Sequence, residues 1–332
     1  MPALLSAGPW LDVIIAILIL LIVIFIVLSM RPFKLKFEIS SHPAGTFEEA
    51  VRRVKEIQNA EGKMADLHPS CGTKMLMHGA KVDRTIVFLH GFTSCPAQFA
   101  QLGQEYFDKG YNVYLPRTPR HGLKDRLGSQ LKGLCAEEMA EFASQSVDIA
   151  QGLGRRVIVV GLSGGGSMTT WLSQQRNDID LAVPISPFLG VGFIPRKLNR
   201  SLTHLILLLP DFFMWWDPIQ KEKNPNSTPY SYTRYPIHAL FENLRLGYVA
   251  EAGARKVKPA AGSILTITNA NDDSINNEVV AEFEQIWRGY GEGFLRTFQF
   301  PKDLQLPHDL ITVGRPNARV EVVYPKIHEL IK

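Results

Sequence analysis

A single serine set among glycines, directly after an apolar run, is the feature that most constrains the fold of this chain. Residues 159–168 read VVGLSGGGSM, and the apolar run 156–161 before the serine is typical of a strand buried on both faces of a parallel sheet. The pattern G-x-S-x-G between such a strand and a helix forms a sharp turn that exposes the serine hydroxyl. We therefore expect Ser163 to be a nucleophile at the carboxyl end of a sheet, where α/β sheets bind their ligands.

The glycines around Ser163 also allow a second interpretation, a loop that binds phosphate. Such a loop needs the lysine of a Walker motif or the spacing G-x-G-x-x-G, and the sequence has neither at this point. Nucleic-acid binding is not indicated, because the net charge is only +4 and no run of Lys and Arg is interleaved with aromatic residues. Three cysteines (Cys71, Cys95, Cys135) are too few and too scattered for a disulfide framework, which fits a reducing compartment.

The N-terminal region contains an apolar run long enough to cross a membrane. Residues 10–30 read WLDVIIAILILLIVIFIVLSM, which as a helix would span about 31 Å, close to the thickness of a bilayer core. A cleaved signal peptide is the alternative, but no Lys or Arg precedes the run and no small-x-small site follows it. Arg31, Lys34 and Lys36 follow at once, so the positive-inside rule predicts a single-pass protein of the cell membrane with a cytoplasmic catalytic domain.

Apolar runs that alternate with helical patterns predict an α/β fold with a mostly parallel central sheet. The helical patterns begin with residues 46–62, where Thr46 and Glu49 form a capping box. Further helical patterns lie at 99–110, 136–152 and 278–290, and a last one lies near the C-terminus. The strand-like runs are 73–78, 84–90, 111–116, 156–161, 181–186, 263–268 and 294–300.

The alternation breaks in the middle of the chain. Residues 187–260 are rich in aromatic residues and prolines, and we interpret them as a cap inserted into the α/β domain. The sequence thus predicts a transmembrane anchor at 1–30, a linker and leading helix at 31–72, a core in two parts at 73–186 and 261–332, and the cap between them.

A serine nucleophile needs a general base and an acid that orients it. After an elbow of this type the acid precedes the histidine in the chain. His308 follows the last strand-like run, whereas His328 lies in the terminal helical pattern and is expected at the surface. Asp272 and Asp273 both follow the strand-like run 263–268; we favour Asp272 as the acid and leave Asp273 as the alternative.

A tetrahedral oxyanion needs two backbone N–H donors in fixed positions. The residue after the nucleophile, Gly164, would supply one. The loop His90-Gly91-Phe92 after an early strand would supply the other from Phe92, because Gly91 permits an unusual backbone angle. A simple turn is the alternative interpretation of this loop.

Five segments together resemble the α/β-hydrolase superfamily, and most of all its bacterial carboxylesterases and monoacylglycerol lipases. The segments are FLHGFTSCPAQF, YLPRTPRHG, GLSGGG, NANDDSIN and LPHD, and the resemblance covers residues 73–320. It implies an α/β-hydrolase fold and an esterase that uses no metal and no organic cofactor. Arg120 departs from the family pattern, which has glycine there. The roles implied are Ser163 as nucleophile, Asp272 as acid, His308 as base, and Phe92 and Gly164 as oxyanion donors.

The resulting hypothesis is a membrane-anchored serine hydrolase that cleaves acyl esters, among them lipid esters such as monoacylglycerols. Its partners would be the ester substrate and the membrane, with no nucleic acid. Alternatives are a thioesterase, amidase, peptidase or acyltransferase with the same triad, or an inactive hydrolase fold that only binds. The cap aromatics could line an acyl pocket or form the cap's own core; these are Phe212, Phe213, Trp215 and Trp216.

Overall fold

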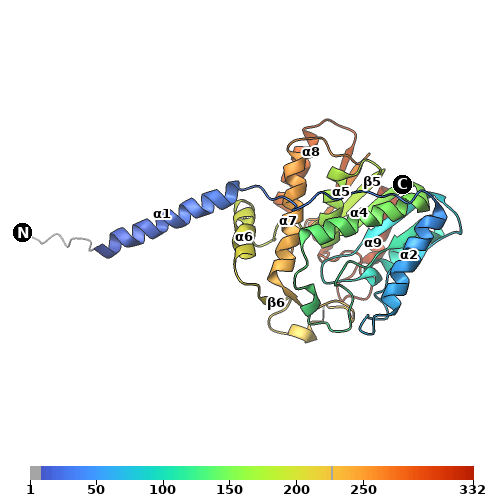
Figure 1. The fold of residues 1–332 in the computed structure, drawn as a ribbon, viewed down its shortest axis with the longest axis horizontal. Coiled ribbons are helices and arrows are strands. Elements are labelled where there is room, and N and C mark those ends of the chain that lie inside the picture. The colour runs from blue at the N-terminus through green and yellow to red at the C-terminus, as the bar shows by residue number, and fades with distance from the viewer. Residues whose placement is uncertain (1–8, 226) are drawn as a thin grey trace, which may run out of the picture.

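A seven-stranded sheet with helices on both faces forms the body of the molecule (Figure 1). The computed structural model describes residues 9–225 and 227–332. The strand order is β1-β3-β2-β4-β5-β8-β9, and only β1 runs antiparallel to its neighbour. The predicted α/β-hydrolase architecture is therefore confirmed. The strands are β1 (Lys74–Leu76), β2 (Val82–Leu89), β3 (Asn112–Leu115), β4 (Gly154–Leu162), β5 (Leu181–Ile185), β8 (Ile264–Asn269) and β9 (Leu295–Phe300).

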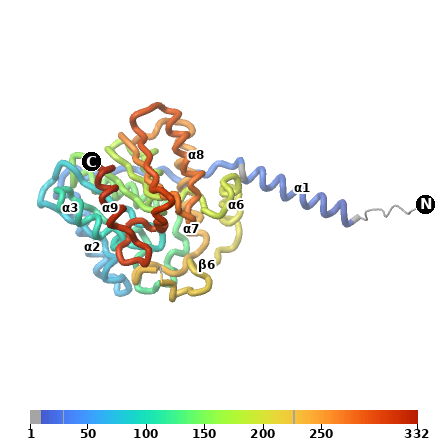
Figure 2. Tube along the Cα trace, turned by 180° about the vertical axis from the view of Figure 1, so that it is seen from behind, coloured from blue at the N-terminus to red at the C-terminus, as the bar shows by residue number. Residues whose placement is uncertain are grey.

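Two apolar cores lie on the two faces of the sheet. Side chains alternate between the faces of a strand, so Val87 and Leu89 of β2 enter one core while Ile86 and Phe88 enter the other. Figures 1 and 2 show the two helical layers from opposite sides. One core packs against α2 (Phe47–Gly62), α4 (Ala136–Leu153), α5 (Gly164–Gln175), α7 (Ile237–Ala254) and α8 (Asn277–Arg288), and the other against α3 (Ala100–Asp108) and α9 (Val320–Leu330).

The leading helix begins as its sequence predicts. Thr46 is the N-cap of α2, and its side chain accepts a hydrogen bond from the backbone N–H of Glu49. This bond satisfies one of the free N–H groups of the first turn, which typically stabilises a helix by about 1 kcal/mol. The Glu49 carboxylate turns back to the backbone N–H of Gly45. Ala50 and Val54 then face the core from one side of the helix.

The region expected as a cap consists of two parts. Its outer part holds α6 (Arg196–Leu208), the hairpin of β6 (Phe213–Trp215) and β7 (Arg234–Pro236), and a 3-10 turn at Lys221–Lys223. The following helix α7 packs against α5 and belongs to the layer on the sheet. Gly247 lets α7 approach the loop after β5 closely, because a Cβ there would lie 2.8 Å from a methyl carbon of Leu189.

The apolar N-terminal run forms one helix, α1 (Pro9–Met30), that extends away from the body next to α6 (Figures 1 and 2). Residues 10–28 have a mean hydropathy of 3.6 and none of them is buried, which passes the length and composition test for a membrane span. Residues 1–8 of the expected anchor lie outside the described part. Helices of soluble cores and signal sequences pass the same test, but the lack of burial separates α1 from a core helix.

The segment 31–45, expected as a linker, lies packed along the body. Phe33 is buried, and its ring stacks on His204 at 3.7 Å and on Tyr248 at 5.2 Å. His204 also contacts the carbonyl of Arg31 through Nε2 at 3.0 Å. Further along, Asp148 of α4 accepts hydrogen bonds from the Ser41 hydroxyl and the backbone N–H of residue 42. The exit of α1 is therefore held against α6 and α7.

Candidate active site

Ser163 occupies the turn between β4 and α5. Its backbone has φ 55° and ψ −113°, in the left-handed half of the map that side chains other than glycine rarely enter. The crossing of strand and helix at this turn leaves no room for side chains: a Cβ at Gly161 would lie 2.1 Å from the carbonyl oxygen of Gly165, and one at Gly165 would lie 2.0 Å from that of Leu89. The backbone N–H of Ser163 donates to the carbonyl of Ile185, which ties the turn to β5.

Asp272 and His308 come together beside this turn. Asp272 follows β8 and its side chain is fully buried, and its Oδ2 lies 2.7 Å from Nδ1 of His308. Its other carboxylate oxygen accepts from the backbone N–H groups of Ser274 and Ile275. Asp273 instead accepts a long hydrogen bond from the Ser274 hydroxyl. The structure thus brings His308 to Asp272, the aspartate that sequence reasoning favoured.

The two side chains alter each other's charge equilibrium. Burial works to raise the pKa of Asp272, but the charge of His308 and its hydrogen bond outweigh burial and hold that pKa below its ordinary value. Burial works to lower the pKa of His308, but the charge of Asp272 and the same hydrogen bond raise it overall. The pair therefore favours a carboxylate next to an imidazole whose Nδ1 carries the proton, which leaves Nε2 as the basic nitrogen.

Ser163 and His308 line one cavity of about 220 Å³. The cavity lies between the carboxyl ends of the strands and the outer part of the cap, and Leu162, Phe188 and Leu240 form an apolar part of its wall. His328, which sequence reasoning placed at the surface, lies on α9 with Nε2 2.7 Å from a carboxylate oxygen of Glu105. His328 is not among the residues that line this cavity.

The two predicted oxyanion donors lie side by side. The backbone nitrogen of Phe92 lies 3.1 Å from the point where a Cβ of Gly164 would stand. Within residues 9–225 and 227–332, neither N–H has a hydrogen-bond acceptor. Two unpaired backbone N–H groups next to a serine hydroxyl form an arrangement that can bind a developing oxyanion.

The loop that carries Phe92 is held by several contacts. Thr93 has φ 65°, a left-handed conformation that costs about 1 kcal/mol or more for a residue with a side chain. Its carbonyl accepts from the backbone N–H of Tyr232, and its hydroxyl accepts from Nε1 of Trp216. The cap thus contacts the loop directly, and Trp216 also lines the cavity. Of the four cap aromatics in question, only Trp216 is among the described lining residues; Phe213 and Trp215 pack on Arg234.

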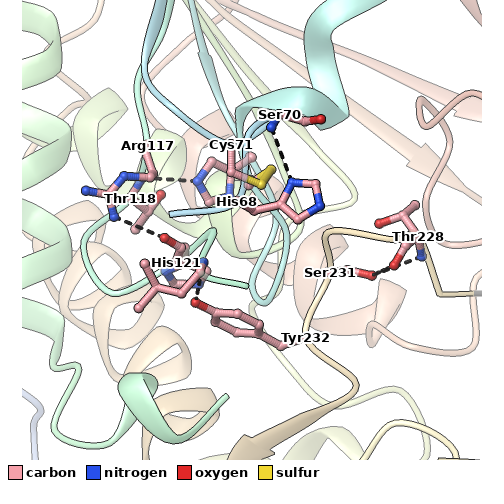
Figure 3. The surroundings of a disulfide bond; sticks show 12 residues. His68, Ser70, Cys71, Arg117, Thr118, His121, Thr228, Ser231 and Tyr232 are labelled. Atoms are coloured by element: carbon pink, nitrogen blue, oxygen red, sulfur yellow. Dashed lines mark hydrogen bonds between the residues drawn. A yellow bond between two sulfur atoms is a disulfide. The ribbon is translucent and has the colours of Figure 1, made fainter. Parts of the chain in front are cut away.

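A disulfide joins Cys71 and Cys95, although the sequence pattern indicated no disulfide framework (Figure 3). The two residues are 24 positions apart, and their Cα atoms lie 5.3 Å apart. The pairing was not predicted because it joins two loops, one before β1 and one after β2, that only the folded sheet brings together. Closing a loop of this length typically stabilises a fold by about 3 kcal/mol. Cys135 is free.

Gln98 and Asp309 are site residues that sequence reasoning missed. Gln98 lies in the 3-10 turn η1 (Pro96–Phe99), where its Oε1 accepts from the N–H of Gly91 at 2.7 Å and its Nε2 donates to Asp309. Asp309 directly follows His308. No motif marks either residue, because their role depends on two loops 211 residues apart in the chain.

Arg120 departs from the glycine of the family pattern but keeps its conformation. Its φ is 65°, in the region that favours glycine. The guanidinium donates to the Glu138 carboxylate and to the carbonyl of Lys132. These contacts offset part of the backbone strain, which explains how arginine is tolerated at this position.

Comparison with known proteins shows which family this chain belongs to. Residues 86–302, more than half of the chain, match the model of the alpha/beta hydrolase family. The chain belongs to the alpha/beta hydrolase family. A curated relative of this chain is the thermostable monoacylglycerol lipase of Bacillus sp. (strain H-257), 27% identical over 168 residues. That match covers 48% of this chain and 60% of the relative, so it spans less than two thirds of the length of that lipase.

Solved structures share the fold of this hydrolase at low sequence identity. A structure from work on LipS and LipT, two metagenome-derived lipolytic enzymes, has a TM-score of 0.59 at 18% identity and covers 80% of this chain and 98% of its own. The monoacylglycerol lipase of Paleococcus ferrophilus has a TM-score of 0.56 at 16% identity, with 78% and 97% covered. A soluble variant of the Saccharomyces cerevisiae monoglyceride lipase has a TM-score of 0.58 at 12% identity, with 78% and 90% covered.

Proposed function

We propose that this protein is a membrane-anchored serine hydrolase that cleaves acyl esters, with Ser163 as nucleophile, His308 as general base and Asp272 as the orienting acid. The observation that carries the proposal is the 2.7 Å contact between His308 Nδ1 and Asp272, in the same cavity as a serine on a strained turn. A serine hydroxyl is a weak nucleophile at neutral pH and needs such a base to react.

The reaction would run in two halves. Nε2 of His308 takes the proton of Ser163 as Oγ attacks the ester carbonyl, and the N–H groups of Phe92 and Gly164 bind the oxyanion. Asp272 stabilises the imidazolium. The tetrahedral intermediate then expels the alcohol, which leaves with the proton from His308. Water attacks the acyl-enzyme by the same route and releases the carboxylic acid.

A lipid ester is the substrate class that we favour. The relatives with lipase names support it, as does the apolar part of the cavity wall. The helix α6, which packs next to α1, also exposes large apolar side chains, among them Leu205 and Leu208. With α1 in the bilayer, these side chains would lie near the membrane surface, where a monoacylglycerol partitions.

Covalent labelling tests the nucleophile and the base. The full chain in lipid nanodiscs is treated with a fluorophosphonate, and the modified residue is identified by mass spectrometry. We expect the label on Ser163, no label after Ser163→Ala, and slow labelling after His308→Gln. His328→Gln is the matched control and should label at the wild-type rate. Full esterase activity in Ser163→Ala would refute the mechanism.

Two further measurements address the substrate and the anchor. Hydrolysis rates of esters with acyl chains from two to eighteen carbons should peak at medium or long chains, whereas a peak at acetate esters would contradict the lipid assignment. Membranes washed with alkaline carbonate should retain the chain, and its N-terminal sequence should still include residues 10–28. Loss of these residues would show that α1 is a cleaved signal peptide.

A further inference from the structure

The Cys71–Cys95 disulfide lies directly behind the loop that carries the Phe92 oxyanion donor. Cys95 follows Phe92 by three positions, and both sulfur-bearing side chains are fully buried. In the same loop, the N–H of Ser94 donates to the carbonyl of Gly91, which closes a tight turn. A covalent bond therefore fixes one end of a turn whose other end presents an N–H group to the cavity.

This turn needs a restraint from outside. Thr93 at its centre holds a left-handed backbone conformation that an isolated turn would leave. Within the described part of the chain, the only residues that donate hydrogen bonds to Thr93 are Tyr232 and Trp216, and both belong to the cap. The disulfide connects the same turn to the body of the domain.

The other end of the disulfide rests on a rigid part of the body. Two residues after Cys71, Thr73 donates both its backbone N–H and its hydroxyl to the carboxylate of Glu61 on α2. Glu61 is buried, and Nε of Arg117 contacts it at 2.8 Å. The Arg117 backbone N–H in turn donates to the Thr73 hydroxyl. The disulfide thus connects the oxyanion turn to a buried ion pair between α2 and the segment after β3.

A third segment packs against the disulfide and backs the Phe92 ring. Gly122 has φ 77°, and a Cβ there would lie 2.7 Å from that of Cys71, so only glycine fits over the disulfide. The neighbouring His121 ring contacts the Phe92 ring edge-on at 5.9 Å. Movement of the Cys95 side of the turn would therefore disturb both the backbone of Phe92 and the surface that supports its ring.

We propose that the Cys71–Cys95 disulfide is a positioning element of the active site: it holds the N–H of Phe92 where the oxyanion forms, and the enzyme reaches full activity only where this bond can form. The inference rests on the proposed ester hydrolysis at Ser163. It also replaces the expected cytoplasmic location with an oxidising compartment, because buried structural disulfides form and persist there. The three basic residues after α1 favour the cytoplasm under the positive-inside rule. We give the disulfide more weight as an indicator of the compartment, because the charge bias is small.

Kinetics of cysteine variants test the positioning role in the full chain. We expect Cys71→Ala, Cys95→Ala and the double variant to lose kcat by a similar factor, about 10-fold, because each removes the same bond. KM should change by less than about 3-fold, since the turn contributes to the transition state more than to substrate binding. The matched control is Cys135→Ala, which leaves the disulfide intact and should keep the wild-type kcat.

A transition-state analogue separates positioning from loss of folded enzyme. Active sites are first counted by fluorophosphonate labelling, so that kcat refers to reactive Ser163 only. A trifluoromethyl ketone forms a tetrahedral adduct whose oxyanion uses the same N–H groups, so its Ki should rise by the factor by which kcat/KM falls. An unchanged kcat per labelled Ser163, or an unchanged Ki, overturns the positioning role while the proposed function stands. Full activity in Ser163→Ala overturns both.

Reduction of the native disulfide provides a measurement that does not depend on the folding of a Cys71 or Cys95 variant. Dithiothreitol delivers two electrons and two protons to the sulfur atoms and becomes a cyclic disulfide. In the Cys135→Ala background, kcat should fall on reduction and return on reoxidation. Protein from its native membranes, denatured without reductant, should bind one maleimide at Cys135 and three after reduction. Three bound maleimides without reduction would overturn the proposal. So would a kcat that does not change when the disulfide is reduced.

Discussion

Nε2 of Gln98 donates to Oδ2 of Asp309 at 2.9 Å, and this hydrogen bond joins the loop of the oxyanion donor to the loop of the histidine. Both residues are buried. Gln98 also accepts from the N–H of Gly91, so one amide side chain contacts both halves of the site. Asp309 is held in turn by the hydroxyl of Thr312 at 2.6 Å.

We expect Gln98→Ala to lower kcat by about 10-fold, because it frees the Gly91 N–H and leaves Asp309 without one of its donors. Gln98→Glu should lower kcat further, since it places a second carboxylate next to that of Asp309. The measurement is kcat and KM on a soluble ester. Gln104→Ala is the matched control, because Gln104 is exposed on α3 and its amide donates a hydrogen bond to Asp108 on the same helix. Equal kcat in Gln98→Ala and Gln104→Ala would contradict the role.

Asp272→Asn should reduce kcat by about 10³-fold or more, because an amide at that position favours the wrong tautomer of His308. Asp273→Asn is the control one position along the chain and should change kcat little. The Asp272 charge raises the pKa of His308, so the wild-type rate should rise with pH through a midpoint above the ordinary histidine value. A pH profile of kcat/KM tests this midpoint. A midpoint below 6 would contradict the interaction with Asp272.

Acid should destabilise the fold through two buried histidines. Burial is the main cause that lowers the pKa of His121 to about 4 and that of His90 well below its ordinary value. Nε2 of His90 accepts from the N–H of Thr118 and cannot do so when protonated. The unfolded chain binds these protons near pH 6.5, and the folded chain does not. The contribution of His121 to the free energy of unfolding, about 3 kcal/mol, is therefore complete above pH 6.5 and is lost as the pH falls toward 4.

Urea unfolding of the detergent-solubilised chain between pH 7 and pH 4.5 measures this loss. His121→Gln should reduce the proton uptake on unfolding by about one near pH 5.5. His42→Gln is the control, because His42 is exposed, and it should keep the wild-type pH dependence. An identical pH dependence in His121→Gln and wild type would show that His121 is protonated in the fold.

Phe33→Ala should weaken the packing of residues 31–45, which follow α1, against the body of the domain. The substitution removes a buried ring that stacks on His204 and Tyr248, a change that typically costs about 3 kcal/mol or more. We expect faster proteolysis within residues 31–45 and unchanged kcat on a soluble ester, because the segment lies away from the cavity. Phe37→Ala is the matched control, since the Phe37 side chain is 53% exposed. Equal proteolysis of both variants would show that the segment is held without Phe33.

Local patterns in the sequence were sufficient for most of the secondary structure. The strand expected at 156–161 is β4 (Gly154–Leu162), and the helix expected at 46–62 is α2. Apolar runs and caps predict such elements because hydrogen bonds and burial act over a few neighbouring residues. The same locality explains the turn at Ser163: the glycines that it requires lie within two positions of the serine.

The sequence by itself thus determined the α/β fold, the long apolar helix and the turn that holds Ser163, since each depends on residues close together in the chain. Only the tertiary structure decided which aspartate contacts His308, that Cys71 pairs with Cys95, that Gln98 joins two loops, and that residues 31–45 are packed. Each of these depends on the approach of segments far apart in sequence. Such contacts are set by how strands and helices pack across the whole sheet. The sequence favoured Asp272 over Asp273 but carried no local sign of the other three.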